Sequence, residues 1–254
     1  MPAEDPAGTR PPVAILCGGR GTRLQEHTRE IPKPLVEIGG EPIVGHVIAL
    51  YAAQGFERFV LATGYKGSLI EDYARAREWP HGVSVECVDT GADTPTGGRI
   101  KLLEPLLSGG MFCATYADGL ADLDLAALLA FHRDHGANAS VTVVRPELQF
   151  GVAELDGDDR VLGFREKPRS ERWVNGGFFC FETPVFDRLD EGSVLEREPL
   201  QGLAADGELR AYRHAGFWEC MDTYKDAVAL NDLWASGLAP WRAGVRAGAQ
   251  NQQG

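Results

Sequence analysis

Apolar, β-rich segments alternate with helix-like segments up to about Pro146, and this alternation restricts the fold more than any other feature. Strands are expected at 13–17, 56–63, 83–88, 111–116 and 140–145, and helices at 42–54, 66–77, 98–107 and 124–135. Strands joined by helical crossovers form a mostly parallel sheet with helices on both faces. Ligands of such sheets bind beyond the carboxyl ends of the strands, so functional residues are expected there.

The pattern changes after Pro146. Two short alternating segments flank the turn-forming residues 156–159, which predicts a hairpin with strands at 151–155 and 161–166. The remaining elements are expected as strands at 176–181 and 209–214 and helices at 184–189, 199–205 and 223–236. We therefore expect one α/β domain over residues 12–242, with flexible segments at 1–11 and 243–254.

Composition narrows the classes of function. The net charge of −12 argues against a nucleic-acid surface, and it means that a polyanionic substrate needs a local cationic site. The five cysteines are an odd number, well separated in apolar surroundings, so buried and reduced thiols are expected. No apolar run is long enough to cross a bilayer, and the N-terminus lacks the order of a secretory signal. A cytoplasmic protein that binds no membrane is expected.

The strongest local signal is the Gly-rich segment LCGGRGTRL, residues 16–24, directly after the first strand. Glycines let the backbone approach a ligand and turn N–H groups toward phosphate oxygens, and Arg23 adds a bidentate cation. The segment matches neither the dinucleotide nor the P-loop glycine motif. A short distance on, Pro32 and Pro34 restrict the backbone around Lys33, which favours an ammonium held toward a phosphate. The alternatives are an ordinary tight turn and a solvated loop lysine.

GGRGTRL followed by PKPL on the first crossover resembles the signature of the sugar-1-phosphate nucleotidyltransferases. Within that family the chain resembles the glucose-1-phosphate cytidylyltransferases, over roughly residues 13–240. The supporting stretches occur in the family's order: PKPLVEIGGEPIVGH, TGYKG, VDTGADTPTGGRIK, TYADGLADLDL, FREKP, NGGFF and GFWECMDT. The chain departs from the family pattern at Cys17 and Ala117, both still small, and in a shorter segment before Val83.

The resemblance implies a Rossmann-like three-layer nucleotidyltransferase fold, with a nucleotide-binding part at about 12–145 and a small β-rich sugar-binding part at about 146–242. It implies transfer of a nucleoside monophosphate from an NTP to a sugar 1-phosphate, with release of pyrophosphate. CTP and glucose 1-phosphate are favoured, while UTP, dTTP or GTP and other sugar phosphates stay open. A glycosyltransferase and a non-catalytic sugar-nucleotide-binding protein are the alternatives of another class. No nucleic-acid partner is expected, and a homo-oligomer is left open.

Two aspartates are candidates for a metal site. Asp118 follows the strand at 111–116, and Asp222 lies near a helix start. Hard Mg²⁺ prefers carboxylate oxygens together with water and phosphates, and the resemblance assigns both aspartates to Mg²⁺. The alternatives are a turn formed by Asp118 with Gly119 and a helix N-cap at Asp222.

The resemblance also implies the substrate contacts. Arg23 would hold the leaving phosphates, Lys33 the α-phosphate and Lys167 the sugar phosphate, so these three and Asp118 are the expected catalytic residues. The nucleotide-binding residues are expected to be Leu16, Cys17, Gly18, Gly19, Arg20, Gly21, Thr22, Arg23, Lys33, Thr94, Gly98, Arg99 and Ala117. The sugar-phosphate-binding residues are expected to be Glu166, Lys167, Asn175 and Gly176. For Arg99 a surface helix position is the alternative, and for Asn175 a hairpin rim.

Two histidines lie three residues apart in the helix expected at 124–135. His132 and His135 would share one helix face, which could hold a metal, but the segment FHRDH is otherwise polar. A solvated face is therefore expected.

Overall fold

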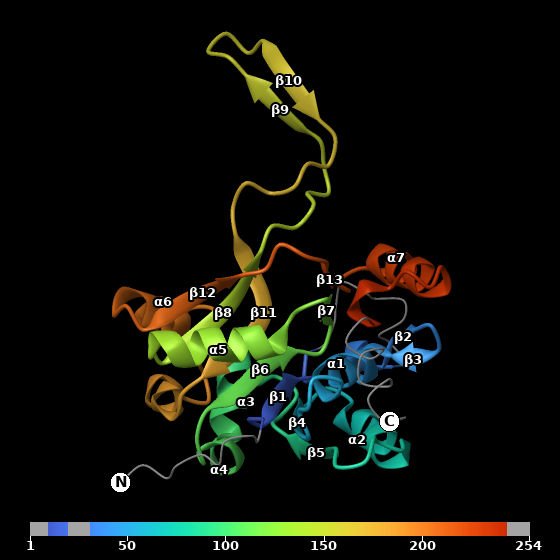
Figure 1. Cartoon of the computed structure of the whole chain (residues 1–254), viewed down its shortest axis with the longest axis vertical. Coiled ribbons are helices and arrows are strands. Elements are labelled where there is room, and N and C mark those ends of the chain that lie inside the picture. Colours follow the sequence, from blue (N-terminus) through green and yellow to red (C-terminus); the bar gives the residue numbers. More distant parts are fainter. Residues whose placement is uncertain (1–9, 20–30, 243–254) are drawn as a thin grey trace.

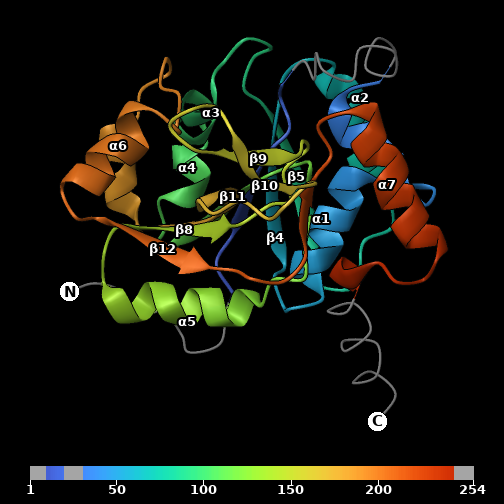
Figure 2. The same cartoon turned by 90° about the horizontal axis from the view of Figure 1, so that it is seen from above.

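A seven-stranded sheet forms the centre of the molecule, with helices on both of its faces (Figures 1 and 2). The computed structural model describes residues 10–19 and 31–242, so most of the two segments expected to be flexible lies outside it. The strand order is β12-β8-β11-β6-β1-β4-β5. Only β11 runs antiparallel to its neighbours, which confirms the expected mostly parallel sheet.

The strands are β1 (Val13–Leu16), β2 (Glu37–Ile38), β3 (Glu41–Pro42), β4 (Arg58–Thr63), β5 (Ser84–Asp89), β6 (Phe112–Tyr116), β7 (Gly119–Ala121), β8 (Ala139–Val144), β9 (Val152–Leu155), β10 (Val161–Arg165), β11 (Val174–Phe181), β12 (Leu209–Arg213) and β13 (Trp218–Cys220). The helices are α1 (Ile43–Ala52), α2 (Gly67–Ala76), α3 (Thr96–Leu102), α4 (Glu104–Leu107), α5 (Leu125–His135), α6 (Glu198–Ala205) and α7 (Tyr224–Ala235), with 3₁₀ turns η2 (Lys33–Leu35), η3 (Thr183–Arg188) and η4 (Pro240–Arg242).

The elements expected from the sequence all occur, with two differences in kind. The helix expected at 98–107 is two short helices, α3 and α4, because Pro105 at the start of α4 cannot continue the hydrogen bonds of α3. The helix expected at 184–189 is the 3₁₀ turn η3. The short strand pairs β2–β3 and β7–β13 were not expected, and the second of them proves important for the site.

Side chains alternate between the two faces of the central strands, and each face has its own apolar core. Val13 and Ile15 of β1 pack in the cluster that includes α1, α5 and α7, whereas Ala14 packs in the cluster with α3, α4 and α6. Burying one such Val or Ile side chain contributes about 1.5–3 kcal/mol to folding. The two cores fix the sheet between its helical layers and so fix the loops at its edges.

The part of the chain after residue 145 does not fold separately, because β11 and β12 are inserted into the central sheet. What does leave the body is a long hairpin, here called the arm (residues 146–172), which carries the two-stranded sheet β9–β10 (Figure 1). Its register confirms the hairpin expected at 151–166. Among the described residues, no helix is both long and apolar enough to cross a membrane.

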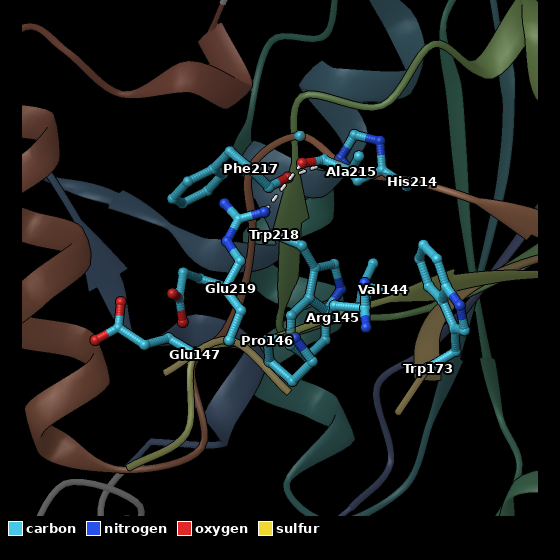
Figure 3. Close-up of a pocket in the computed structure, with 12 residues that line it drawn as sticks. Val144, Arg145, Pro146, Glu147, Trp173, His214, Ala215, Phe217, Trp218 and Glu219 are labelled. Atoms are coloured by element: carbon cyan, nitrogen blue, oxygen red, sulfur yellow. Dashed lines mark hydrogen bonds between the residues drawn. The ribbon is translucent and has the colours of Figure 1, made fainter. Parts of the chain in front are cut away.

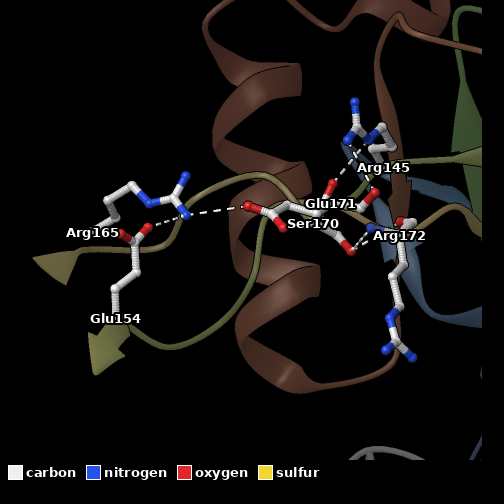
Figure 4. A network of polar contacts seen from close by, with 6 residues as sticks. All are labelled: Arg145, Glu154, Arg165, Ser170, Glu171 and Arg172. Atoms are coloured by element: carbon white, nitrogen blue, oxygen red, sulfur yellow. Dashed lines mark hydrogen bonds and ion pairs between the residues drawn. The ribbon is translucent and has the colours of Figure 1, made fainter. Parts of the chain in front are cut away.

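Polar contacts join the outgoing and returning segments of the arm near its base (Figure 4). Arg145 donates from Nε and Nη2 to the carbonyl oxygens of Ser170 and Glu171, both at 3.0 Å. Further along, Arg165 pairs with Glu154 at 2.9 Å and with Glu171 at 3.2 Å. These groups are exposed, and surface ion pairs of this kind typically contribute less than about 1 kcal/mol each.

Candidate active site

A cavity of about 320 Å³ opens beyond the carboxyl ends of β1 and β6. Strand β1 pairs in parallel with β4 on one side and β6 on the other, so the loops after β1 and β6 diverge there. Such a divergence is where ligands bind in open α/β sheets, as the sequence predicted. The cavity is lined by Leu16, Cys17, Gly18, Gly19, Lys33, Pro34, Ala92, Asp93, Thr94, Pro95, Thr96, Arg99, Tyr116, Ala117 and Asp118.

Lys33 is held by a rigid local backbone. It is the first residue of η2, between Pro32 and Pro34, both of which are buried. The Pro32 carbonyl accepts from Leu35 N at 2.9 Å and the Lys33 carbonyl from Val36 N at 3.1 Å. Because proline fixes φ and the turn is closed by these hydrogen bonds, the Lys33 side chain leaves the backbone in one direction. Its side chain is only 13% exposed.

Asp118 and Asp222 are brought together by the strand pair β7–β13. In its antiparallel register Cys220 faces Gly119, which puts the residue before Gly119 close to the residues after Cys220. The amide of Met221 donates to the Asp118 carbonyl at 2.9 Å. The backbone of Asp222 is fixed in turn because its N–H donates to Asp226 Oδ2 at 3.0 Å. The short strand pair β7–β13 thus brings together two residues that are far apart in the chain.

The Lys33 ammonium lies between the two carboxylates. Its Nζ is 2.6 Å from Asp118 Oδ2 and 3.0 Å from Asp222 Oδ1. Burial on its own lowers the pKa of Lys33, but the charge and hydrogen bonds of the two aspartates outweigh it and raise the pKa above its usual value. The two carboxylates are therefore already within reach of a single cation. That arrangement fits a divalent ion with oxygen ligands, the donor set that Mg²⁺ prefers.

The sequence alternatives for these aspartates can now be judged. The N-cap of α7 is Thr223, which forms a capping box with Asp226, so the N-cap alternative for Asp222 is wrong. Asp118 does belong to the turn between β6 and β7, but its carboxylate bonds Lys33 rather than closing that turn.

The described part of the Gly-rich loop is tied to Arg99. Leu16, Cys17, Gly18 and Gly19 line the cavity, while Arg20, Gly21, Thr22 and Arg23 lie outside the described residues. Arg99 donates from Nη2 to the Gly18 carbonyl at 3.0 Å and from Nη1 to the Thr63 carbonyl at 2.9 Å. A Cβ at Gly18 would lie 1.8 Å from Arg99 Nη1, so a side chain there would displace the buried guanidinium from these hydrogen bonds.

Arg99 is 4% exposed, so the surface-helix alternative is wrong. It also donates to Thr90 Oγ1 at 2.6 Å and to the Ala92 carbonyl at 3.4 Å, which means that it braces the loop that carries Thr94. Thr94 lines the cavity, as does Ala117. Gly98 does not: a Cβ there would lie 2.1 Å from the Glu191 carbonyl oxygen, so its lack of a side chain lets α3 pack against residues 190–193.

The expected sugar-phosphate residues divide into two groups. Asn175 and Gly176 are the second and third residues of β11, and Asn175 Nδ2 donates to Tyr116 Oη of the cavity wall at 3.3 Å. Glu166 and Lys167 lie on the arm and line neither described cavity, so the structure does not bring all four together. The reason is that the two segments of the arm pack against each other, so that Glu166 lies against Gly151. A Cβ built at Gly151 would be only 2.8 Å from Glu166 Oε2.

A second cavity, of about 250 Å³, lies where the arm joins the body (Figure 3). It is lined from two sides by Val144–Glu147 and by His214–Glu219, with Arg169 and Trp173. Trp218, one of its walls, donates from Nε1 to the Gly176 carbonyl at 2.8 Å, which links this cavity to the start of β11. Burial, together with the charges of Asp226 and Glu147, raises the pKa of Glu219 on its wall.

Several cavity residues escaped the sequence argument. Tyr116 and Thr96 stood inside stretches that carried the resemblance, but an aromatic strand residue and a threonine at a helix start also suit purely structural roles. Glu196, which bonds both of them, gave no signal at all in the sequence. Only the folded chain brings it near them.

The two histidines of α5 are not on a solvated face, so that expectation is wrong. His132 is 1% exposed, and its Nδ1 lies 2.8 Å from Ser140 Oγ, which is also 2.7 Å from His135 Nε2. Since His135 Nδ1 accepts from Ala137 N, His135 Nε2 donates to Ser140, whose hydroxyl then donates to His132. The segment FHRDH is mostly polar, so nothing in the sequence indicated that its histidines contact β8. All five cysteines are free thiols, three of them buried, as expected.

Comparison with known proteins places these features in context. The family model described as Nucleotidyl transferase matches residues 13–219. A probable glucose-1-phosphate cytidylyltransferase of Bacillus subtilis (strain 168) is 40% identical, over 91% of this chain and 98% of the relative. A glucose-1-phosphate cytidylyltransferase of Salmonella typhi is 41% identical, with the same coverage. A mannose-1-phosphate guanylyltransferase of Mycobacterium tuberculosis is 34% identical, over 90% of this chain and 66% of the relative.

Solved structures share the fold. The crystal structure of HddC from Yersinia pseudotuberculosis superposes with a TM-score of 0.71 at 22% identity, covering 89% of this chain and 100% of that one. A putative glucose-1-phosphate thymidylyltransferase from Bacillus anthracis gives a TM-score of 0.69 at 18% identity, covering 88% and 95%.

Proposed function

Because the chain belongs to the nucleotidyl transferase family, we propose that it transfers CMP from CTP to glucose 1-phosphate, giving CDP-glucose and pyrophosphate. Relatives that match nearly end to end show that the chain is a sugar-1-phosphate nucleotidyltransferase. The observation that carries the proposal is the convergence of Lys33, Asp118 and Asp222 at the edge of the cavity.

The reaction needs no protein nucleophile. An oxygen of the sugar phosphate attacks the α-phosphorus of the triphosphate, the bond from that phosphorus to the bridging oxygen breaks, and pyrophosphate leaves with that oxygen. Catalysis then consists of positioning the two polyanions and neutralising the charge that spreads in the transition state. In a chain of net charge −12, the cationic groups that neutralise this charge must be gathered at the site itself.

The roles are proposed as follows. Lys33 contacts the α-phosphate, and Arg23 the leaving phosphates. Asp118 and Asp222 hold Mg²⁺, which when bound supplies positive charge to the phosphates. The loop from Leu16 to Gly19 surrounds the triphosphate, and the wall at Thr94 contacts the nucleoside.

The sugar side of the proposal has two parts. Asn175 and Gly176 contact the sugar phosphate, and Asn175 adjoins the cavity wall through Tyr116. Glu166 and Lys167 would act in the same subsite only if the arm carried them to it. Lys167 has a positive φ of 44°, a conformation that costs a non-glycine residue on the order of 1 kcal/mol and that clusters at functional sites.

The proposal also names the base, cytosine, and the sugar, glucose. The cytidylyltransferase relatives are more similar to this chain than the guanylyltransferase relative, which favours CTP over GTP. UTP and dTTP, and hexose 1-phosphates other than glucose 1-phosphate, are the alternatives. A pyrophosphate-release panel that crosses CTP, UTP, dTTP, GTP and ATP with several sugar 1-phosphates tests the choice. We expect the largest kcat/KM for CTP with glucose 1-phosphate.

The same panel separates the other classes of function. A glycosyltransferase would consume CDP-glucose and release no pyrophosphate from CTP and a sugar phosphate. A binding protein without catalysis would release none with any pair. Either result would contradict the proposal, whereas strong release with another pair would correct only its choice of base or sugar.

We also propose that the protein forms a homo-oligomer in the cytoplasm. The arm exposes Phe150 at 78%, Phe164 at 66% and Leu162 at 64%, and an isolated two-stranded sheet is marginally stable in water. The free thiols suit a reducing compartment. Sedimentation of the purified chain tests the assembly: a monomer at micromolar concentration would contradict it, and replacing Phe150 and Phe164 by serine should weaken it.

A further inference from the structure

A glutamate behind the cavity wall joins two residues that line the cavity. The Glu196 carboxylate accepts from Thr96 Oγ1 at 2.6 Å and, through its other oxygen, from Tyr116 Oη. Thr96 is the first residue of α3, and Tyr116 is the last residue of β6. Glu196 itself is partly buried and does not line the cavity. It therefore holds residues that can touch a substrate without reaching one itself.

The same contacts continue from Tyr116 to the start of β11. Tyr116 Oη donates to Glu196 and accepts from Asn175 Nδ2 at 3.3 Å, while Asn175 Oδ1 accepts from Gly177 N at 2.8 Å. The Asn175 amide is thus held at both ends. An asparagine side chain has two N–H groups and two lone pairs, so one donor and one acceptor stay available for a ligand. Asn175 is exposed, which leaves them accessible.

Close packing leaves little freedom in this arrangement. A Cβ at Gly177, where φ is +78°, would lie 2.4 Å from Tyr116 Cδ2, so the tyrosine ring lies directly on the β11 backbone. On the other side, Gly98 N donates to the Ser193 carbonyl and Leu195 N to Thr96 Oγ1, both at 3.0 Å. The segment that carries Glu196 is therefore fixed against α3.

We propose that Glu196 is a positioning residue for the sugar phosphate: through the Tyr116 hydroxyl it orients the Asn175 amide, and through Thr96 it ties that amide to the nucleotide wall. The inference rests on the proposed function, because it takes Asn175 as a ligand of the sugar phosphate. Without the carboxylate, the Tyr116 hydroxyl loses its acceptor and turns, and Asn175 loses its fixed partner. The residues proposed to contact the triphosphate have hydrogen bonds of their own: the Gly-rich loop through Arg99, and Lys33 through the turn η2.

The test is the steady-state kinetics of Glu196→Ala, with CTP and glucose 1-phosphate or the best pair from the panel. We expect the KM for the sugar phosphate to rise about tenfold, which is the loss of roughly one hydrogen bond, with the KM for the triphosphate changed less than twofold. Glu196→Gln keeps an acceptor for Tyr116 and should restore most of the loss. Glu198→Ala, which removes an exposed carboxylate two residues away, is the matched control and should leave both KM values unchanged.

A double-mutant cycle separates positioning from mere folding support. Because Glu196 acts through Asn175, Glu196→Ala should add nothing to Asn175→Ala. Tyr116→Phe, which deletes only the linking hydroxyl, gives the same test if Glu196→Ala does not fold. Additive effects, or equal rises in both KM values, would overturn the inference. So would an active enzyme in which Asn175→Ala leaves the sugar-phosphate KM unchanged, while the proposed function would stand. A wild type inactive with every pair overturns both.

Discussion

The Lys33 ammonium lies 2.6 Å from Asp118 Oδ2, although the two residues belong to different crossovers of the sheet. Two prolines fix one partner, and the turn between β6 and β7 fixes the other. Asp222 joins them from a third part of the chain, at 3.0 Å from the same nitrogen. Lys33 and the two carboxylates thus meet beside the cavity, each on a support from a different part of the chain.

Replacing Asp118 by asparagine should nearly abolish turnover without unfolding the protein. The change removes a carboxylate that we assign to Mg²⁺, and loss of one such electrostatic group typically costs about 100- to 1,000-fold in kcat. Pyrophosphate release and thermal melting check the two halves of this expectation. Asp187→Asn, at an exposed position of η3, is the matched control and should behave as wild type. A fully active Asp118→Asn enzyme would remove the metal assignment.

Replacing Lys33 by methionine should uncouple the two aspartates from their cation. Removing the Lys33 charge increases the repulsion between the two carboxylates, so the variant should be less stable without metal, and Mg²⁺ should stabilise it more than wild type because the ammonium no longer competes. The difference in melting temperature with and without Mg²⁺ measures this directly, without any turnover. Lys225→Met, exposed on α7, serves as the control. An equal Mg²⁺ effect in wild type and Lys33→Met would speak against a shared cation position.

Adding a methyl group at Gly18 should destabilise the protein, whereas adding one at Gly19 should not. A Cβ at Gly18 would lie 1.8 Å from Arg99 Nη1, while one at Gly19 has no neighbour within 4 Å among the described residues. Overpacking of this kind costs about 1–3 kcal/mol, and a substitution that meets no described neighbour is expected to change stability by less than about 0.5 kcal/mol. Urea unfolding of Gly18→Ala and Gly19→Ala compares them. Equal stability of the two variants would mean that Arg99 does not occupy the position described.

Stability should fall in mild acid because of His132. Burial, and then the charges of His135 and Arg133, lower the pKa of His132 to about 4. Below the unfolded value of about 6.5 the unfolded chain binds a proton that the folded chain resists, so stability is full above pH 6.5 and is lost as the pH falls toward 4. The loss should be on the order of 3 kcal/mol.

The comparison of wild type with His132→Gln isolates that effect, because glutamine can bond Ser140 but does not titrate. His135, Arg133 and Glu182 remain in both proteins and cancel in the difference. Urea midpoints at pH 7, 6, 5 and 4 should converge as the pH falls, since only wild type loses the His132 contribution. Parallel curves would show that His132 titrates normally.

Much of the fold could be predicted from the sequence because the signals are local. The apolar run Val13–Leu16 predicts a strand, and Pro42 predicts a helix start, which it marks as the N-cap of α1. The alternation of strands and helices then implies a parallel sheet. The strand pair β7–β13 could not be predicted, since three-residue strands carry no period. That pair sets the distance between Asp118 and Asp222, so the resemblance predicted that the two aspartates meet, but the strands that bring them together could not be predicted.

The surroundings of His132 and Glu196 could not be predicted from the sequence either. A histidine in a polar-looking helix segment is buried only because β8 places Ser140 against it, and Glu196 matters only because α3 and β6 converge on its carboxylate. Both depend on contacts between distant segments, which no local pattern records. The position of Glu166 and Lys167 on the arm has the same cause, because the hairpin was expected but its direction away from the body was not.

The most direct measurement follows oxygen atoms through the reaction. Glucose 1-phosphate labelled with ¹⁸O at its phosphate oxygens is incubated with unlabelled CTP and Mg²⁺, and both products are weighed by mass spectrometry. If the sugar phosphate attacks the α-phosphorus, all of the label is found in the nucleotide sugar and the pyrophosphate carries none. Labelled pyrophosphate or labelled free phosphate would contradict direct transfer between the two substrates.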